Sequence, residues 1–283
     1  MDIQKQGNEY TINYDFMCKN SEILVNDIVI DQSLYGNLGG MEFINQFILQ
    51  SGKQSVKLRM IHPFAEKGGE YPFEVLEEYG KDFNIFQTVY NKSGDIVDMK
   101  IIKNLSLSKI KMATPIVERE WSFEAELPFE LEGWKNSEDL SKWDKNELEK
   151  KVVNKYKYLR ELLNQGNGSE FIRELSLANQ EYFDANYISL SEQEKYIENL
   201  IDLFNGLKGK ASEISDYKMR ILGEGKVVVL EKLSGKFSQK GILSVEDKEN
   251  KKFYSIYVML HKKKTSDDFE IIRMQAFTTA LIE

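Results

Sequence analysis

Between residues 121 and 131 the chain alternates strictly between apolar and polar side chains, and near residue 135 this period of two gives way to helical spacing. The apolar positions are Trp121, Phe123, Ala125, Leu127, Phe129 and Leu131. Side chains of a strand point alternately to opposite faces, so the segment predicts a strand with one dry face and one acidic, solvated face. The change of period predicts two domains, the first made of strands and the second beginning with amphipathic helices.

The first domain, residues 1–134, is predicted to be an all-β sandwich, because short apolar runs alternate with turn residues throughout it. It also contains all four prolines of the chain. The expected strands cover residues 10–16, 23–30 with a turn at Asn26-Asp27, 55–62, 83–90, 96–103 and 116–131.

A stretch within this domain carries a resemblance. Residues 45–58 place a short apolar turn, a glycine turn at Gly52 and an alternating strand in sequence. This order resembles a stretch of galactose-binding-like jelly-roll modules. The resemblance implies a β-sandwich that recognises carbohydrate.

Residues 133–141 are polar and rich in turn formers, and a linker is expected over 135–142. The second domain, residues 143–283, should open with a helix capped by Asp144 and Glu147 and ended by Gly166 and Gly168. A second helix presents Phe171, Leu175, Ala178 and Tyr182 on one face, and a third is expected to be capped by Ser191 with Glu194. Strands follow near residues 217–222, 227–230, 241–245, 253–260 and 269–274.

Helices followed by an antiparallel sheet make this domain α+β, and their order resembles the NTF2-like cone. That family packs its helices on a curved sheet, and a strand within the helical run would fit it better; residues 186–190 offer the one candidate. The cone mouth hosts enzymes or ligand-binding modules, which implies a pocket. Its expected lining is Tyr182, Tyr187, Tyr254 and Tyr257.

The run at residues 253–260 is apolar on both faces of its strand, whereas helices can cover only one face of a sheet. Leaving the other face in water would expose more apolar surface than a monomer usually tolerates. The cover is therefore expected to be the first domain or a second subunit, and a homodimer through this sheet stays open.

The net charge of −8 is unevenly distributed. Residues 1–139 carry −9, because 23 acidic side chains there face 14 basic ones. Such a field repels nucleic acid and anionic membranes and favours encounter with a basic protein. No apolar run approaches the roughly 18 residues of a membrane helix, and the first residues show no basic-then-apolar leader, so a cytoplasmic protein is expected.

Residues suited to catalysis or metal binding are few. His62 and His261 are the only histidines and Cys18 the only cysteine, which excludes a four-ligand Cys/His zinc site within the chain. No nucleophile elbow of the Gly-x-Ser-x-Gly type occurs, and Gly223-Glu224-Gly225-Lys226 lacks the spacing of a phosphate loop and predicts a turn between strands. We expect no cofactor or metal, and lean against an enzyme.

Four carboxylates share one face of the alternating segment: Glu124, Glu126, Glu130 and Glu132. Like charges so placed are tolerated, and they can protect a sheet edge from aggregation. The alternative is docking of a basic partner, for which Trp121 and Trp134 would be aromatic anchors if exposed.

The sequence thus favours a non-catalytic protein-interaction protein, with neutralisation of a toxin or effector, as immunity proteins do, as one form of that role. Two alternatives remain. One is an enzyme or small-molecule binder using the cone pocket, and the other is carbohydrate binding through the sandwich.

Overall fold

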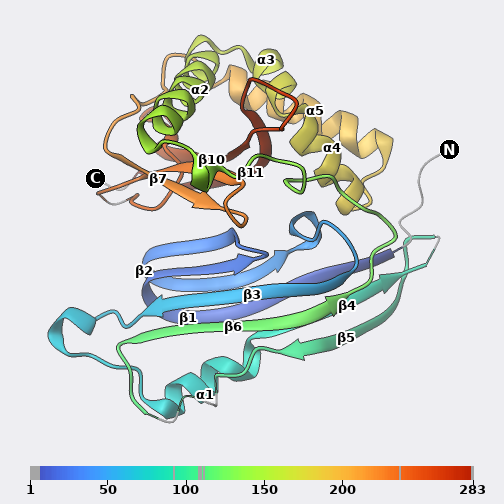
Figure 1. Cartoon of the computed structure of the whole chain (residues 1–283), viewed down its shortest axis with the longest axis vertical. Helices are drawn as coiled ribbons and strands as arrows, with labels where there is room; N and C mark the ends of the chain where they lie inside the picture. Colours follow the sequence, from blue (N-terminus) through green and yellow to red (C-terminus); the bar gives the residue numbers. More distant parts are fainter. Residues whose placement is uncertain (1–6, 92, 108–109, 111, 236, 282–283) are drawn as a thin grey trace. The chain divides into compact units, whose positions relative to one another are not determined.

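The computed structural model describes residues 7–91, 93–107, 110, 112–235 and 237–281. The protein is mixed α+β, with its strands in two sheets (Figure 1). The chain divides into two compact units, which we describe separately. Unit 1 comprises Met1–Leu131 with Asp184–Ser189, and unit 2 comprises Glu132–Phe183 with Leu190–Glu283.

Unit 1 is built on one antiparallel sheet centred on the long strand β1. Its elements are β1 (Gly7–Val25), β2 (Ile28–Phe43), η1 (Asn45–Phe47), β3 (Gly52–Ile61), η2 (Ala65–Lys67), α1 (Phe73–Asp82), β4 (Asn84–Tyr90), β5 (Ile96–Asn104) and β6 (Ile116–Ala125). β1 pairs with β2 from Thr11 to Val25, with β4 through its first half and with β3 through its second half. The order β5-β4-β1-β3-β6 makes β5 and β6 the end strands of that path.

The core of unit 1 follows from the alternation along β1. Tyr10, Ile12, Tyr14 and Phe16 are all at most 1% exposed. Phe16 meets the ring of Phe83, just after α1, edge to face at 5.0 Å. The aromatic face of β1 therefore packs against the α1 region.

The predicted β character of this part is confirmed, but two features differ from a β-sandwich. All six strands belong to one curled sheet, since β1 is long enough to pair with three neighbours (Figure 1). A helix, α1, also lies in the segment between β3 and β4, where Leu76 is buried and the flanking glutamates are exposed. The predicted turn at Asn26-Asp27 is confirmed, and both residues have the positive φ of a two-residue hairpin turn.

The alternating segment that begins at Trp121 is a strand only as far as Ala125, so the predicted strand end at residue 131 is wrong. Beyond Ala125 the chain has no strand ladder and bends at Pro128, and Leu131 donates its N–H to the carbonyl of Leu49 at 2.8 Å. Burial still alternates through this stretch, with Leu131 buried and Glu126 and Glu130 exposed. The alternation therefore predicts correctly which side chains are buried, but it does not predict where the ladder of strand hydrogen bonds ends.

The helices of unit 2 begin largely where the sequence predicts. They are η3 (Leu140–Lys142), α2 (Lys145–Gln165), α3 (Gly168–Glu174), α4 (Ser176–Ala185) and α5 (Leu190–Asn205). Asp144 caps α2 by accepting the N–H groups of Asn146 and Glu147, and Gly166 ends it in the left-handed conformation.

Three expectations about these helices need correction. The second predicted helix is two helices, α3 and α4, which meet at Leu175. α5 already begins at Leu190, so Ser191 lies inside its first turn and is not its cap. Residues 186–190 form no strand but a turn that leads into α5, and Tyr187 there has a positive φ of 54°.

The five-stranded sheet of unit 2 has the order β11-β10-β8-β7, with β9 also paired to β10. Its strands are β7 (Tyr217–Leu222), β8 (Val227–Lys232), β9 (Leu243–Asp247), β10 (Lys252–His261) and β11 (Glu270–Ala280). One face packs on the helices: Tyr156 of α2 is fully buried, accepts the N–H of Leu230 at 3.1 Å and donates to the carbonyl of Val258. The other face of β10 is also buried, and Tyr257 and Met259 are 5% and 0% exposed.

Candidate functional site

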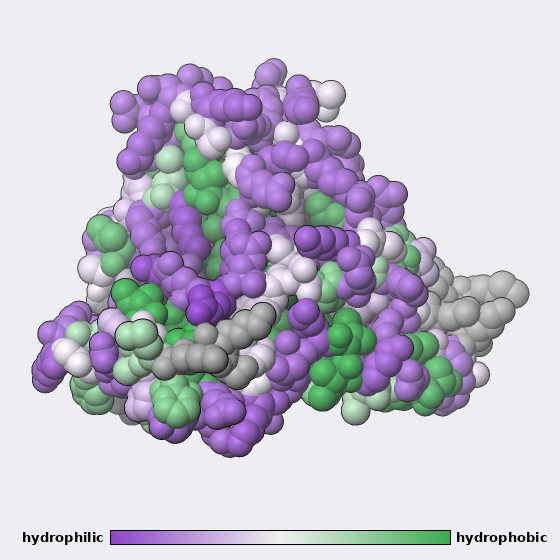
Figure 2. All heavy atoms as spheres, turned by 60° about the horizontal axis from the view of Figure 1, so that its bottom comes forward, coloured by the Kyte–Doolittle hydropathy of each residue, from purple (hydrophilic) through white to green (hydrophobic). Residues whose placement is uncertain are grey.

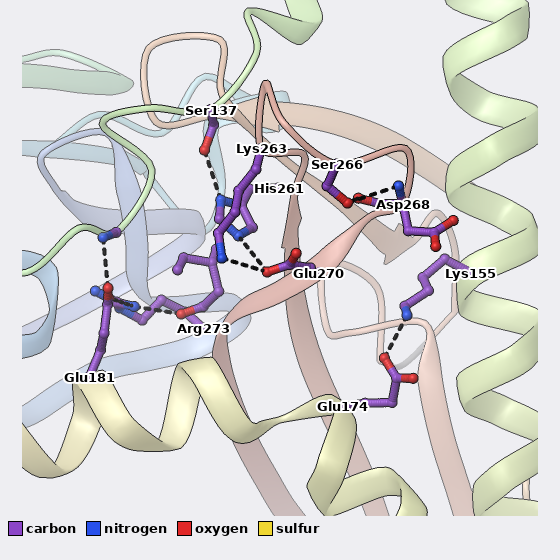
Figure 3. Close-up of polar contacts among 12 residues, drawn as sticks. Ser137, Lys155, Glu174, Glu181, His261, Lys263, Ser266, Asp268, Glu270 and Arg273 are labelled. Carbon is purple, nitrogen blue, oxygen red and sulfur yellow. Dashed lines mark hydrogen bonds and ion pairs between the residues drawn. The ribbon is translucent and has the colours of Figure 1, made fainter.

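Arg273 on β11 is a fully buried charged residue of unit 2, with 1% of its surface exposed (Figure 3). Its Nη1 donates to Oε2 of Glu181 on α4 at 2.7 Å and to the carbonyl of Ile272 at 2.5 Å. Glu181 accepts the N–H of Gly133 with its other oxygen at 2.7 Å, and the ring of Trp134 lies 5.4 Å from the guanidinium. Burial lowers the pKa of Arg273, and the carboxylate of Glu181 counteracts this.

A second buried cluster surrounds His261 at the end of β10. Its Nδ1 lies 2.7 Å from Oγ of Ser137, and its Nε2 lies 3.9 Å from the carboxylate of Glu270. Lys263 pairs with that same carboxylate at 3.0 Å (Figure 3). Burial lowers the pKa of His261 to about 4, so the imidazole is neutral near pH 7.

Serine, histidine and a carboxylate are the residue types of acyl-transfer triads, but here they are closed to substrate. Ser137 is 2% exposed and His261 is 1% exposed, so an attacking hydroxyl would have no acyl group to reach. The cluster is better explained as internal hydrogen bonding that ties the segment before α2 to β10. His62 is also used locally: its Nδ1 accepts the N–H of Phe64 at 3.2 Å and its ring packs on Tyr71.

Residues 135–142, where a linker is expected, are bound tightly within unit 2. Glu138 pairs with Lys262 at 2.5 Å and accepts from the indole of Trp143 at 3.0 Å, and its N–H bonds to the Lys262 carbonyl. The side-chain hydrogen bond from Lys262 lowers the pKa of Glu138. Leu140 is buried and donates its N–H to the carbonyl of Gly225, in the turn that the sequence predicts between two strands.

A pocket of about 580 Å³ opens between α2, the end of α3 and the loop before β11. It is lined by Lys151, Asn154, Lys155, Tyr158, Glu174, Asp267, Asp268 and Phe269. Within it, Lys155 and Glu174 form an ion pair at 2.5 Å, with side chains 17% and 22% exposed (Figure 3). The volume lies in the range of small-molecule sites, and the lining mixes cations, carboxylates and aromatic rings.

None of the four tyrosines expected in a pocket lines this one. Tyr182 stacks on Tyr196 with ring centroids 5.6 Å apart, and the hydroxyl of Tyr257 donates to Glu231 at 2.6 Å. Tyr187 belongs to unit 1, where its hydroxyl donates to the carbonyl of Asn8 at 3.0 Å. Tyr254 is partly buried at the edge of the unit 2 core.

Glu124, Glu126 and Glu130 of unit 1 are exposed, as is Glu132 of unit 2. The register of β3 and β6 places Lys53 opposite Glu124, a pairing that the sequence period could not reveal. Such opposite pairs offset the mutual repulsion of the carboxylates.

The two tryptophans considered as anchors for a partner differ in exposure. Trp121 is half-buried and meets Phe83 edge to face at 5.4 Å. Trp134 is 6% exposed and lies against Arg273 within unit 2, so the condition that it be exposed is not met. Its role in this structure is packing.

Cys18 is fully buried, and burial raises the pKa of its thiol, which keeps it in the unreactive protonated form. Across the described residues, no three His, Cys, Asp or Glu side chains gather as a metal site would require. In the same part of the chain, no helix is both long and apolar enough to cross a bilayer.

Sequence reasoning missed the Arg273–Glu181 pair and the lysines of the pocket. One signal for Arg273 was present: an arginine in the middle of an otherwise apolar strand requires a buried partner. Comparison with protein-family models, with curated proteins and with solved structures finds no match.

Proposed function

We propose that this protein is a non-catalytic binding protein that docks a basic protein surface on unit 1. The observation that carries the proposal is a row of exposed carboxylates, Glu124, Glu126 and Glu130, which begins in β6 and continues just after it. β6 is an end strand of the sheet. The groups best suited to catalysis are committed elsewhere: His261 and Ser137 to each other, and Cys18 to the core.

The ladder between β3 and β6 places Lys53 opposite Glu124 and ends at the pair Gly52 with Ala125, so Glu126 and Glu130 lie beyond it. The part of the chain that carries these carboxylates is acidic, with 23 acidic and 14 basic side chains over residues 1–139. A carboxylate surplus in an acidic part of the chain attracts a basic partner over a distance of about one Debye length, roughly 8 Å at physiological salt. Neutralisation of a basic toxin or effector is the form of binding that this chemistry favours.

The test is co-purification of partners from the native host with two variants of equal charge change. Replacing Glu124, Glu126 and Glu130 by lysine should abolish capture of a stoichiometric basic protein. The matched control replaces Glu74, Glu77 and Glu78, which are exposed on α1, by lysine and should leave capture intact. Equal capture by both variants, or equal loss from both, contradicts docking at the row.

A second function, binding of a small polar molecule, is favoured by the pocket of unit 2. Its partly buried Lys155–Glu174 pair would give way to a ligand that carries both a carboxylate and an ammonium group, with Phe269 and Tyr158 alongside. A thermal-shift screen of zwitterionic compounds tests this. Stabilisation of the native protein that is lost in Lys155→Met supports it, and stabilisation kept in that variant refutes it.

We infer that unit 2 is an NTF2-like domain, supported by helices that precede the strands and by a core of helices on one sheet face. Limited proteolysis of the full chain tests the domain limits. Cleavage confined to residues 126–132 supports a joint there, and first cleavage within 135–142 contradicts the close packing of that segment.

A further inference from the structure

The end strand β5 of unit 1 exposes large apolar side chains, and its register with β4 puts Ile96, Met99 and Ile101 on one face. Ile96, Val97, Met99 and Ile101 are between 55% and 64% exposed. β5 pairs with β4, and among the described residues its other edge carries no ladder. Apolar groups reach the surface between hydrophilic ones on the face that Figure 2 brings forward.

The strand at the other end of this path, β6, has a more polar exposed surface. On β6 the apolar Val117 and Phe123 are buried, and exposed positions such as Glu118 and Glu120 carry charge. An edge strand with free backbone groups and exposed apolar side chains is a template for another strand, whereas charge discourages such pairing. β5 is therefore better suited to strand addition than β6, whose one exposed large apolar side chain is Ile116.

We propose that β5 pairs antiparallel with β5 of a second copy of this chain, about a two-fold axis at Met99. In that register Asp98 lies opposite Lys100 of the second copy, and Lys100 opposite its Asp98. A two-fold interface uses one patch twice, so each favourable pair occurs twice.

Two other ways of pairing β5 with itself, parallel and shifted antiparallel, are less favourable because of the charges on Asp98 and Lys100. Parallel in-register pairing places Asp98 on Asp98 and Lys100 on Lys100, and like charges directly opposite are destabilising. Moving the axis by half a residue places Asp98 opposite Ile101 and leaves both charges without a partner across the strands. The register about Met99 gives Asp98 and Lys100 opposite charges as partners and places the two Met99 side chains opposite each other.

The bulges of β5 limit the extent of this ladder. Val97 and Ile102 are the extra residues where its register with β4 shifts, so the regular part runs from Asp98 to Ile101. A ladder this short gives a small interface, and small interfaces are weak. The dimer is therefore reversible, and its population depends on protein concentration.

Charge reversal tests the register by sedimentation velocity over a concentration series of the full chain. Asp98→Lys replaces both opposite-charge pairs with like-charge pairs and should raise the dimer dissociation constant at least tenfold. The double variant Asp98→Lys with Lys100→Asp exchanges the charges and should return the constant to within about threefold of wild type. Glu77→Lys, an equal charge change on exposed α1, should have no effect.

Cysteine cross-linking tests the axis, and the one native cysteine is fully buried. In Met99→Cys the two new thiols lie directly opposite, at a Cα separation of about 4.5–5.5 Å that a disulfide can span, so mild oxidation should give a covalent dimer. The matched control is Ile96→Cys, which is similarly exposed. Its two thiols lie six residues apart along the ladder, about 20 Å, and should not cross-link.

A wild-type chain that is monomeric at all concentrations, with no Met99→Cys dimer, overturns the proposal. So does equal cross-linking of both cysteine variants, or a dimer that Asp98→Lys leaves unchanged. Capture of another protein's strand by a monomeric chain overturns it as well, in favour of that occupant. None of these readouts uses Glu124, Glu126 or Glu130, so the docking of a basic partner stands or falls separately.

Discussion

Removing the charge of Glu181 should destabilise unit 2 more than any surface substitution. Glu181→Gln keeps the size of the side chain and an oxygen for the N–H of Gly133, but it leaves the guanidinium of Arg273 buried without a counter-charge. Breaking a buried ion pair by removing one partner costs about 3–5 kcal/mol, because the remaining charge loses its compensation. Arg273 is 1% exposed and Glu181 is 5% exposed, which places this pair in that regime.

The measurement is urea unfolding followed by tryptophan fluorescence in a Trp121→Phe background. Trp134 and Trp143 then report on unit 2 alone, since the chain has three tryptophans. We expect Glu181→Gln to lower the free energy of unfolding by about 3 kcal/mol. The double variant with Arg273→Met should be less destabilised than the sum of the single changes, because it removes both charges together.

Glu147→Gln is the matched control, because Glu147 pairs with Lys151 at 3.6 Å with side chains 60% and 46% exposed. An exposed pair of this kind contributes at most about 0.5 kcal/mol. If Glu181→Gln costs no more than this control, the charge of Arg273 is compensated in some other way. Glu181 would then not be the group that stabilises the buried guanidinium.

Two further outcomes follow from the structure. The pKa of His261 is about 4 in the folded protein and about 6.5 in the unfolded chain, so the folded state binds this proton less tightly. The contribution of the neutral imidazole to the free energy of unfolding is therefore complete above pH 6.5 and is lost as the pH falls towards 4. Wild type should therefore lose about 3 kcal/mol more than His261→Asn between pH 7 and 4 in urea titrations; parallel curves would contradict it. Asp144→Ala should lower the unfolding free energy by about 1 kcal/mol through loss of the α2 cap, with Asp144→Ser close to wild type as the control. Equal loss in both variants would show that the cap oxygen is not what matters.

The parts of the fold that could be predicted from the sequence are those governed by local rules. The five strands of unit 2 lie where apolar and β-branched runs predict them, and the ends of α2 follow from Asp144 and Gly166. The hairpin turn at Asn26-Asp27 was predictable for the same reason, since a left-handed backbone there depends on a few adjacent residues. Each of these features is encoded within one or two helical turns or one hairpin.

The candidate site was much less predictable. The sequence offers Trp134 as a partner anchor on the condition that it is exposed, but the residue packs against Arg273, which lies 139 positions further along the chain. Tyr187 was assigned to a pocket with Tyr182, yet the two residues fall in different units. Side-chain type and spacing give no information on such distant neighbours.

The sequence alone determined the periods: alternation through residue 131, helical spacing afterwards, and an acidic first half. Only the tertiary structure decided that the β1 to β6 strands form one sheet, that Lys53 faces Glu124, and that Glu181 compensates Arg273. The physical reason is that periodicity is fixed by backbone geometry within a segment. Pairing, burial and charge compensation depend on which distant segments the fold brings into contact.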